Sequence, residues 1–145
     1  MSKKVVSRSK APGNLLVALQ EAQARLGYLP PEFMTELADS LRIPVNEVYG
    51  VASFYSFLAT RPLGRNVIRI CKSLPCYLKN CQVIIETLER EIGISPGETT
   101  PDGRFSFELT NCIGLCDRAP AMLINNNPHT DLTPEKISHI LQNYK

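Results

Sequence analysis

Four of the five cysteines in this 145-residue chain fall into two closely spaced pairs. Cys71 and Cys76 form a C-x4-C pair, and Cys112 and Cys116 form a C-x3-C pair. Thiolates in this number and spacing are typical ligands of a zinc ion or of a [2Fe-2S] cluster, since both take four sulfur donors. The spacing alone favours neither metal over the other.

Disulfides and thiol–disulfide exchange are the other common uses of paired cysteines. The basic N-terminus contains only a two-residue apolar run, Val5-Val6, which is too short for a secretory signal. In a reducing compartment, paired cysteines are more often metal ligands than structural disulfides. Thiol–disulfide enzymes favour a C-x-x-C motif at the start of a helix, and this sequence has none. Metal binding is therefore the favoured interpretation.

The fifth cysteine, Cys81, belongs to an apolar helical stripe. The other members of the stripe follow it at helical spacing: Ile84, Ile85, Leu88 and Ile92. Free cysteine often serves as a small buried hydrophobe. We therefore expect Cys81 to be structural and not to bind the metal.

Four other residues lie close to the cysteine pairs in sequence. Lys72, Lys79 and Arg118 are cations, and positive charge near a metal centre favours its more negative, reduced form. Ordinary solvated charge is the simpler interpretation for each of them alone. Gly114 lies between Cys112 and Cys116, where the missing side chain would let a backbone N–H approach sulfur.

Each cysteine pair follows a stretch with the pattern of a β-strand. Val67, Ile68 and Ile70 lie directly before Cys71 and predict a strand that is buried on both faces. Residues 105–109 alternate between apolar and polar side chains, which predicts a half-buried strand. Helices are predicted over 80–92 and 133–144, and a further strand over 121–125. The resulting order from residue 66, β-α-β-β-α, fits a thioredoxin-like α/β domain.

The residues before this domain predict short amphipathic helices. Pro31 and Pro44 are placed to open the second and third helices. In the third helix, four residues are expected to face inward: Val45, Val48, Tyr49 and Ala52. The stretch Arg61-Pro62-Leu63-Gly64 breaks the helical pattern. We therefore expect a basic flexible tail over 1–13, a helical lobe over 14–64 and the α/β domain over 65–145.

Composition and motifs exclude several classes of function. Four of the 16 basic residues lie in the first ten positions, so the remainder has no net positive charge with which to bind nucleic acid. No apolar run approaches the ~20 residues of a membrane span. There is no glycine-rich dinucleotide loop, and neither His129 nor His139 lies beside a nucleophile motif. We expect no complete active site in this chain, and any nucleotide cofactor to lie on another chain.

Several segments besides the cysteine pairs have a sequence specific enough to indicate a family. They are Gly27-Tyr28-Leu29-Pro30, Ile43-Pro44, Val48 to Tyr55, Pro96 to Gly103 and Ala119-Pro120. With these segments the chain resembles the small thioredoxin-like [2Fe-2S] subunit of NADH:quinone oxidoreductase (complex I). The same subunit type occurs in NAD(P)-linked hydrogenases, including electron-bifurcating ones, and in formate dehydrogenases. The resemblance runs from about Gly27 to the C-terminus.

The resemblance implies a site, a cofactor and partners. Cys71, Cys76, Cys112 and Cys116 would hold a [2Fe-2S] cluster, with one pair on each iron. The fold would be a thioredoxin-like [2Fe-2S] ferredoxin domain preceded by a small helical lobe. The chain would carry single electrons beside a larger flavoprotein that binds FMN and NAD(H), together with further Fe-S subunits. Its expected location is the bacterial or archaeal cytoplasm, including the cytoplasmic face of a membrane complex.

Some points stay open at this level. The alternative function is a structural four-cysteine zinc module for complex assembly. The chain also has Ser73-Leu74-Pro75 where the family often has Gly-Thr-Ala, and Asn80-Cys81 where a glycine is common. The segment Ser53 to Phe57 is either a contact for the flavoprotein or a set of core aromatics.

Overall fold

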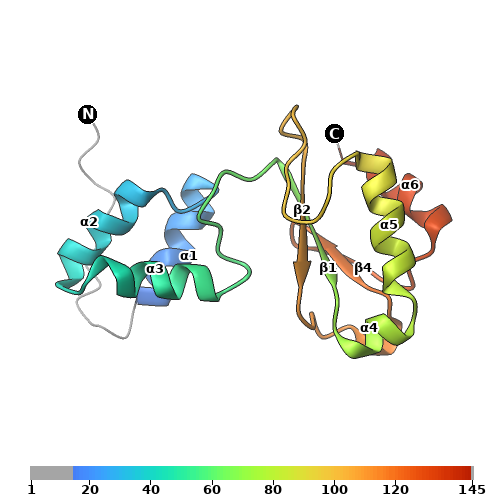
Figure 1. Cartoon of the computed structure of the whole chain (residues 1–145), viewed down its shortest axis with the longest axis horizontal. Coiled ribbons are helices and arrows are strands. Elements are labelled where there is room, and N and C mark those ends of the chain that lie inside the picture. The colour runs from blue at the N-terminus through green and yellow to red at the C-terminus, as the bar shows by residue number, and fades with distance from the viewer. Residues whose placement is uncertain (1–14, 145) are drawn as a thin grey trace. The chain divides into compact units, whose positions relative to one another are not determined.

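The computed structural model describes residues 15–144. The chain divides into two compact units between Pro62 and Leu63, which Figure 1 colours from blue to green and from green to red. The tail expected over residues 1–13 lies outside the described residues. Within residues 15–144, no helix is both long enough and apolar enough to cross a membrane.

The N-terminal unit is helical, as the sequence predicted. Its helices are α1 (Leu15–Leu26), α2 (Pro31–Leu41) and α3 (Val45–Phe54). Pro31 occupies the start of α2, where its missing N–H breaks no helical hydrogen bond. Gly27 follows α1 with a φ of 81°, a conformation that favours glycine. The core contains Leu19, Ala22, Leu29, Phe33, Met34, Leu37, Ala38, Val48 and Ala52.

Helix α3 packs through a narrower face than its sequence predicted. Val48 and Ala52 are fully buried, but the side chains of Val45 and Tyr49 are about half exposed. Residues four apart lie above one another on a helix. Val48 and Ala52 therefore form one row along α3, and Val45 and Tyr49 form the row beside it. Only the row with Val48 faces the core, and the inward orientation predicted for Val45 and Tyr49 was wrong.

The C-terminal unit contains a mixed sheet in the order β2-β1-β3-β4. Its strands are β1 (Asn66–Cys71), β2 (Phe105–Thr110), β3 (Met122–Ile124) and β4 (Asn127–His129). β1 pairs in parallel with β2 and antiparallel with β3. Helices α5 (Cys81–Ile92) and α6 (Pro134–Gln142) lie next to each other on one side of the sheet (Figure 1). Two short helices, α4 (Leu74–Leu78) and the 3-10 helix η2 (Cys116–Arg118), belong to the cysteine loops.

Both faces of the central strands are covered. All six residues of β1 are buried, as predicted. In β2 the polar residues Ser106 and Thr110 are buried as well, so the strand is not half-buried as expected. The hydroxyl of Ser106 accepts a 2.7 Å hydrogen bond from the N–H of Gly64 and lies 2.6 Å from the hydroxyl of Thr99. Segments beyond the sheet therefore cover the polar face of β2.

Candidate metal centre

The two cysteine loops leave the sheet at the same edge. β1 and β2 are parallel, and Cys71 is paired in register with Thr110, two residues before Cys112. The N–H of Lys72 donates a 2.9 Å hydrogen bond to the carbonyl of Thr110. The N–H of Cys71 donates a 3.2 Å hydrogen bond to the carbonyl of Ala121, beyond the second loop. The sheet thus fixes the origin of both loops, as the sequence predicted.

The first pair is buried. Cys71 and Cys76 each expose 1% of their surface, and Cys76 lies within α4 as its one buried residue. Burial tends to raise the pKa of the Cys71 thiol, but hydrogen bonds with Ser73, Cys76 and the N–H of Ile113 hold this pKa below its ordinary value. Burial, together with the neighbouring thiols of Cys71 and Cys81, raises the pKa of Cys76 to about 11. The environment therefore favours ionisation of Cys71 before Cys76.

The second pair is exposed and closely spaced. The sulfur atoms of Cys112 and Cys116 lie 3.2 Å apart. The N–H of Gly114 donates a 3.4 Å hydrogen bond to Cys112 Sγ, and Gly114 has a φ of 83° that glycine adopts without strain. This confirms the expectation that Gly114 lets a backbone N–H approach sulfur. The hydrogen bond with Cys112 raises the pKa of the Cys116 thiol.

The two loops approach each other through Cys71. Its thiol is hydrogen-bonded to the N–H of Ile113, in the second loop, and Cys71 contributes to raising the pKa of the Cys116 thiol. Over residues 15–144, no three cysteine, histidine or acidic side chains converge on one point at metal-binding distance. Within residues 15–144 the four thiols are therefore not preformed as one tetrahedral set.

This donor set suits a cluster with one cysteine pair on each iron. Tetrahedral metal–sulfur bonds of about 2.3 Å place two ligand sulfurs about 3.8 Å apart. The separation of 3.2 Å between Cys112 and Cys116 is within a side-chain adjustment of that value. A single zinc ion would need all four sulfurs at such distances from one another. The spacing of Cys112 and Cys116 thus suits two ligands of one metal atom.

Cys81 is part of the hydrophobic core. It begins α5, exposes 2% of its surface and belongs to the same buried cluster as Ile84 and Leu88. Burial and the nearby Cys71 raise the pKa of its thiol. The burial predicted from the helical stripe is confirmed. Asn80, just before α5, has a φ of 62°, and its side chain makes no capping hydrogen bond.

The charged residues near the loops differ in their contacts. Lys72 and Lys79 are exposed beside the first pair. Arg118, just after the second pair, forms an ion pair with Asp131. The sequence indicated Arg118 as a cation near the ligands but gave no sign of Asp131. The sequence also did not indicate the contact between the N–H of Ile113 and Cys71. Neither Asp131 nor Ile113 belongs to a local sequence pattern that would reveal these contacts.

Comparison with known proteins decides the family. The family model for the thioredoxin-like [2Fe-2S] ferredoxin matches residues 2–145. The chain belongs to this family. Its members are [2Fe-2S] proteins, so the family supports an iron–sulfur cluster over zinc. The predicted thioredoxin-like [2Fe-2S] fold with a helical N-terminal lobe is thereby confirmed.

Curated relatives of this ferredoxin are subunits of oxidoreductases. A subunit of the NADH-quinone oxidoreductase of Escherichia coli is 44% identical over 128 residues, which cover 88% of this chain and 77% of the relative. The subunit of the same name from Pseudomonas aeruginosa is 36% identical, with coverages of 88% and 76%. The HndA subunit of the NADP-reducing hydrogenase of Solidesulfovibrio fructosivorans is 34% identical over 140 residues, with coverages of 97% and 82%.

A solved structure has the same fold over nearly the whole ferredoxin. It is a chain of an NAD+-reducing [NiFe]-hydrogenase in the air-oxidized state, which superposes with a TM-score of 0.79 at 29% identity. The match covers 96% of this chain but 24% of the hydrogenase chain. The ferredoxin thus spans about a quarter of that longer chain.

Proposed function

We propose that this ferredoxin is a one-electron carrier subunit of a multi-subunit NAD(P)H-linked oxidoreductase. Cys71 and Cys76 would bind one iron of a [2Fe-2S] cluster, and Cys112 and Cys116 the other. The observation that carries the proposal is the placement of two thiol pairs on loops from adjoining parallel strands. In a member of a [2Fe-2S] family, this placement brings both pairs to one edge of the sheet.

The residues around the thiols would tune electron transfer. When bound, a [2Fe-2S] cluster accepts and returns one electron. The N–H groups of Ile113 and Gly114 donate to Cys71 and Cys112 respectively, and such donors favour the more negative, reduced form. Burial of Cys71 and Cys76 keeps water from one side of the site, whereas the exposed Cys112 and Cys116 bring the other side to the surface.

We also propose that the electrons come from, or go to, a larger flavoprotein that carries FMN and NAD(H). Further Fe-S subunits would complete the complex in the cytoplasm or at the cytoplasmic face of a membrane. The relatives support this, because they are named as subunits of an NADH-quinone oxidoreductase and an NADP-reducing hydrogenase. This chain has no recognisable nucleotide loop of its own, so the flavin and nucleotide need another protein.

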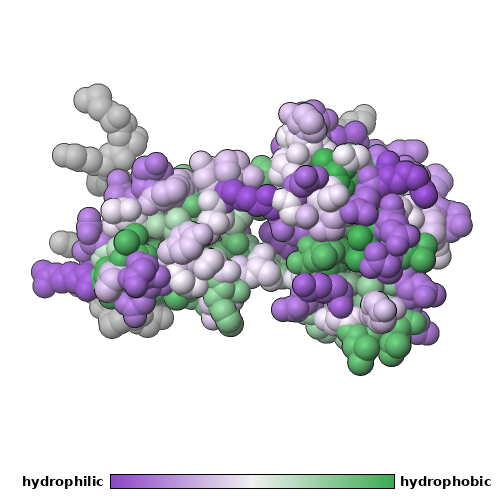
Figure 2. Space-filling model, in the orientation of Figure 1, coloured by the Kyte–Doolittle hydropathy of each residue, from purple (hydrophilic) through white to green (hydrophobic). Residues whose placement is uncertain are grey.

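Each unit has exposed hydrophobic side chains that would serve as contacts for such partners. In the N-terminal unit, Phe54, Tyr55 and Phe57 are 79%, 42% and 45% exposed, so they are not core aromatics. In the C-terminal unit, Leu74, Tyr77 and Leu78 of α4 are also largely exposed, and Figure 2 shows hydrophobic residues gathered where Figure 1 places α4. Aromatic residues are enriched at protein interfaces.

Anaerobic co-purification tests this function. Affinity-tagged protein from its native cells should retain a flavin-containing subunit, identified by mass spectrometry. NADH or NADPH should then bleach the visible absorption of the preparation, but not that of the isolated ferredoxin chain. Substitution of Phe54 by Ser should weaken retention of the flavoprotein, whereas the exposed Glu86→Gln on α5 should not. Bleaching of the isolated chain by NADH, or a native preparation without any flavoprotein, would contradict the proposal.

A further inference from the structure

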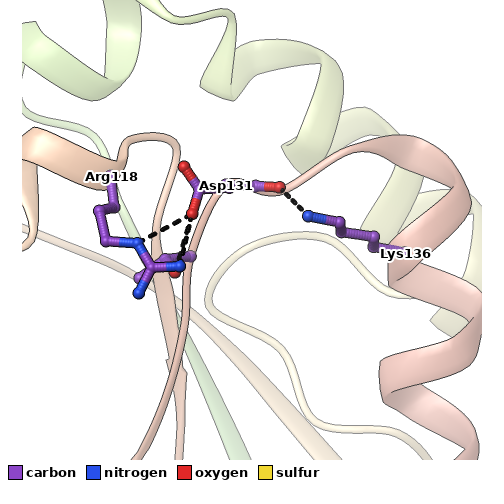
Figure 3. Close-up of polar contacts among 4 residues, drawn as sticks. Arg118, Asp131 and Lys136 are labelled. Atoms are coloured by element: carbon purple, nitrogen blue, oxygen red, sulfur yellow. Dashed lines mark hydrogen bonds and ion pairs between the residues drawn. The ribbon is translucent and has the colours of Figure 1, made fainter.

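Three charged residues join the end of the second cysteine loop to the start of α6. Arg118 Nη2 and Nε lie 2.8 Å and 3.0 Å from Asp131 Oδ2. Lys136 Nζ donates a 2.8 Å hydrogen bond to the carbonyl of Asp131. Figure 3 shows Asp131 between the other two side chains, with Lys136 reaching it from α6. We call this set, Arg118, Asp131 and Lys136, the clasp.

Two backbone hydrogen bonds join the same two segments as the clasp. The N–H of Asp131 donates to the carbonyl of Arg118 at 2.9 Å, and the N–H of Leu132 donates to the carbonyl of Pro120 at 3.2 Å. Leu132 is 4% exposed and belongs to the main core. The chain just after Cys116 is therefore paired with a segment that is anchored in the core.

The backbone of Asp131 indicates that its position is enforced by these contacts. Its φ is 49°, in the left-handed region that non-glycine residues rarely adopt. Such a conformation persists where surrounding interactions over-determine it. At Asp131 the N–H, the carbonyl and the carboxylate each have a partner in the clasp.

The clasp acts on the less protected half of the site. Cys71 and Cys76 are held within the core, but Cys112 and Cys116 are exposed. Cys116 begins η2, a helix of only three residues that Arg118 ends. A contact that fixes Arg118 therefore also fixes the direction in which Cys116 leaves the loop.

We propose that Arg118, Asp131 and Lys136 are positioning residues that hold the Cys116 thiolate in the geometry required for the cluster. The inference rests on the proposed function, because it concerns a ligand of that cluster. It does not require the clasp to stabilise the fold as a whole. The Arg118 and Asp131 side chains are 61% and 48% exposed, and ion pairs this exposed contribute little to global stability.

The test compares variants of the full chain loaded with its cluster. Arg118→Ala and Asp131→Asn each break the ion pair, and asparagine tolerates the left-handed backbone at position 131. The double variant tests whether the two act as a unit. Asp39→Asn, an exposed aspartate on α2, is the matched control. The measurements are the rate of iron release to a chelator, the EPR g-values after reduction with dithionite, the reduction potential and the melting temperature.

Positioning and charge effects predict different results. Arg118→Ala removes a positive charge and Asp131→Asn a negative one, so an effect of charge alone would move the reduction potential in opposite directions. Loss of positioning should change g-values alike in both variants and speed iron release about two- to five-fold, the range open to an exposed ion pair. The double variant should match the single ones. Arg118→Lys, which keeps the charge but loses the Nε contact, should release iron at an intermediate rate.

Other outcomes would overturn the inference. They are unchanged iron release and g-values in Arg118→Ala and Asp131→Asn, additive effects in the double variant, or iron release that only follows a lower melting temperature. If the wild-type chain binds no iron at all, the proposed function fails together with the clasp. If the wild type binds a cluster that the variants hold equally well, only the clasp fails.

Discussion

At the scale of single residues, the two cysteine pairs divide the work of the site. The buried Cys71 and Cys76 occupy a low-dielectric environment, where fixed N–H donors interact strongly with negative sulfur. Cys112 and Cys116 are exposed, and in the proposed function electrons would enter or leave the protein on their side. Cys81 lies in the same buried core cluster as Cys71 and Cys76.

Substitution of each cysteine separates ligands from core residues. Serine in place of Cys71, Cys76, Cys112 or Cys116 should lower the affinity for the cluster by at least ~10-fold, since loss of even an outer partner of a ligand costs about that much. Cys81→Ala should keep the cluster and lose only about 1 kcal/mol of stability for the missing sulfur. Iron and sulfide analysis after gel filtration measures cluster content, and urea unfolding measures stability. Loss of iron from the Cys81 variant alone would show that the ligand assignment is wrong.

His129 predicts a pH dependence of stability. Burial lowers the pKa of His129 below the ordinary 6.5, and its Nε2 lies 2.9 Å from the hydroxyl of Tyr144. Below pH 6.5 the unfolded chain therefore binds this proton more readily than the folded chain. The free energy of unfolding should fall as the pH drops from about 7.5 to about 5.5.

The control for this pH dependence is His129→Gln, which does not titrate in this range. Urea unfolding of both proteins across the same pH series should give a shallower loss for the variant. Equal slopes for the two proteins would exclude His129 as the source.

At the scale of helices and strands, the sequence predicted the elements that have a clear period or a long apolar run. β1 and α5 were predicted close to their observed bounds, because one is apolar on both faces and the other has a regular stripe. Helix α4 was missed, since five residues are too few to show a helical period. β4 was not predicted, because a three-residue edge strand that contains Pro128 has no strand pattern.

The sequence predicted the candidate ligands of the site but not the groups that contact them. Cysteine spacing and the preceding strands placed Cys71 and Cys112 each at the end of a strand, with Cys76 and Cys116 in the loops that follow. The N–H of Ile113 was not predictable, because backbone donors have no sequence signal. The carboxylate of Asp131 meets Arg118 across 13 residues, a separation that no local period encodes.

The substitution Gly64→Ala tests how closely the segment before β1 packs against β2. A Cβ on Gly64 would lie 2.9 Å from the carbonyl carbon of Phe105, which is backbone and cannot move aside. Gly64→Ala should therefore destabilise the C-terminal unit by about 1–3 kcal/mol. The control Gly50→Ala, within α3 and with no atom within 4 Å of its added Cβ, should instead stabilise its helix by roughly 0.5–1 kcal/mol. Urea unfolding measures both, and an unchanged midpoint for Gly64→Ala would contradict the close packing.

At the scale of the whole molecule, each unit has a core of its own, and the thiols belong to only one unit. The core of residues 63–144 contains Cys71, Cys76 and Cys81, and the exposed pair lies in the same unit. The N-terminal unit has no cysteine and presents exposed aromatic residues. This division suggests that one unit carries electrons and the other helps bind the complex.

Separate expression tests the division. Residues 63–145 alone should fold and bind the cluster, because their core and all candidate ligands are present. Their iron content per chain should equal that of the full-length protein, while co-purification of the flavoprotein should weaken. A fragment that is soluble and folded by circular dichroism but holds no iron would show that the helical lobe is part of the site.

The central claim is that four cysteines hold a two-iron cluster, and its most direct test is metal and sulfide analysis joined to EPR on anaerobically purified protein. The account predicts a brown protein with two irons and two acid-labile sulfides per chain and an S = 1/2 signal after reduction with dithionite. A colourless protein with one zinc per chain and no EPR signal would contradict it.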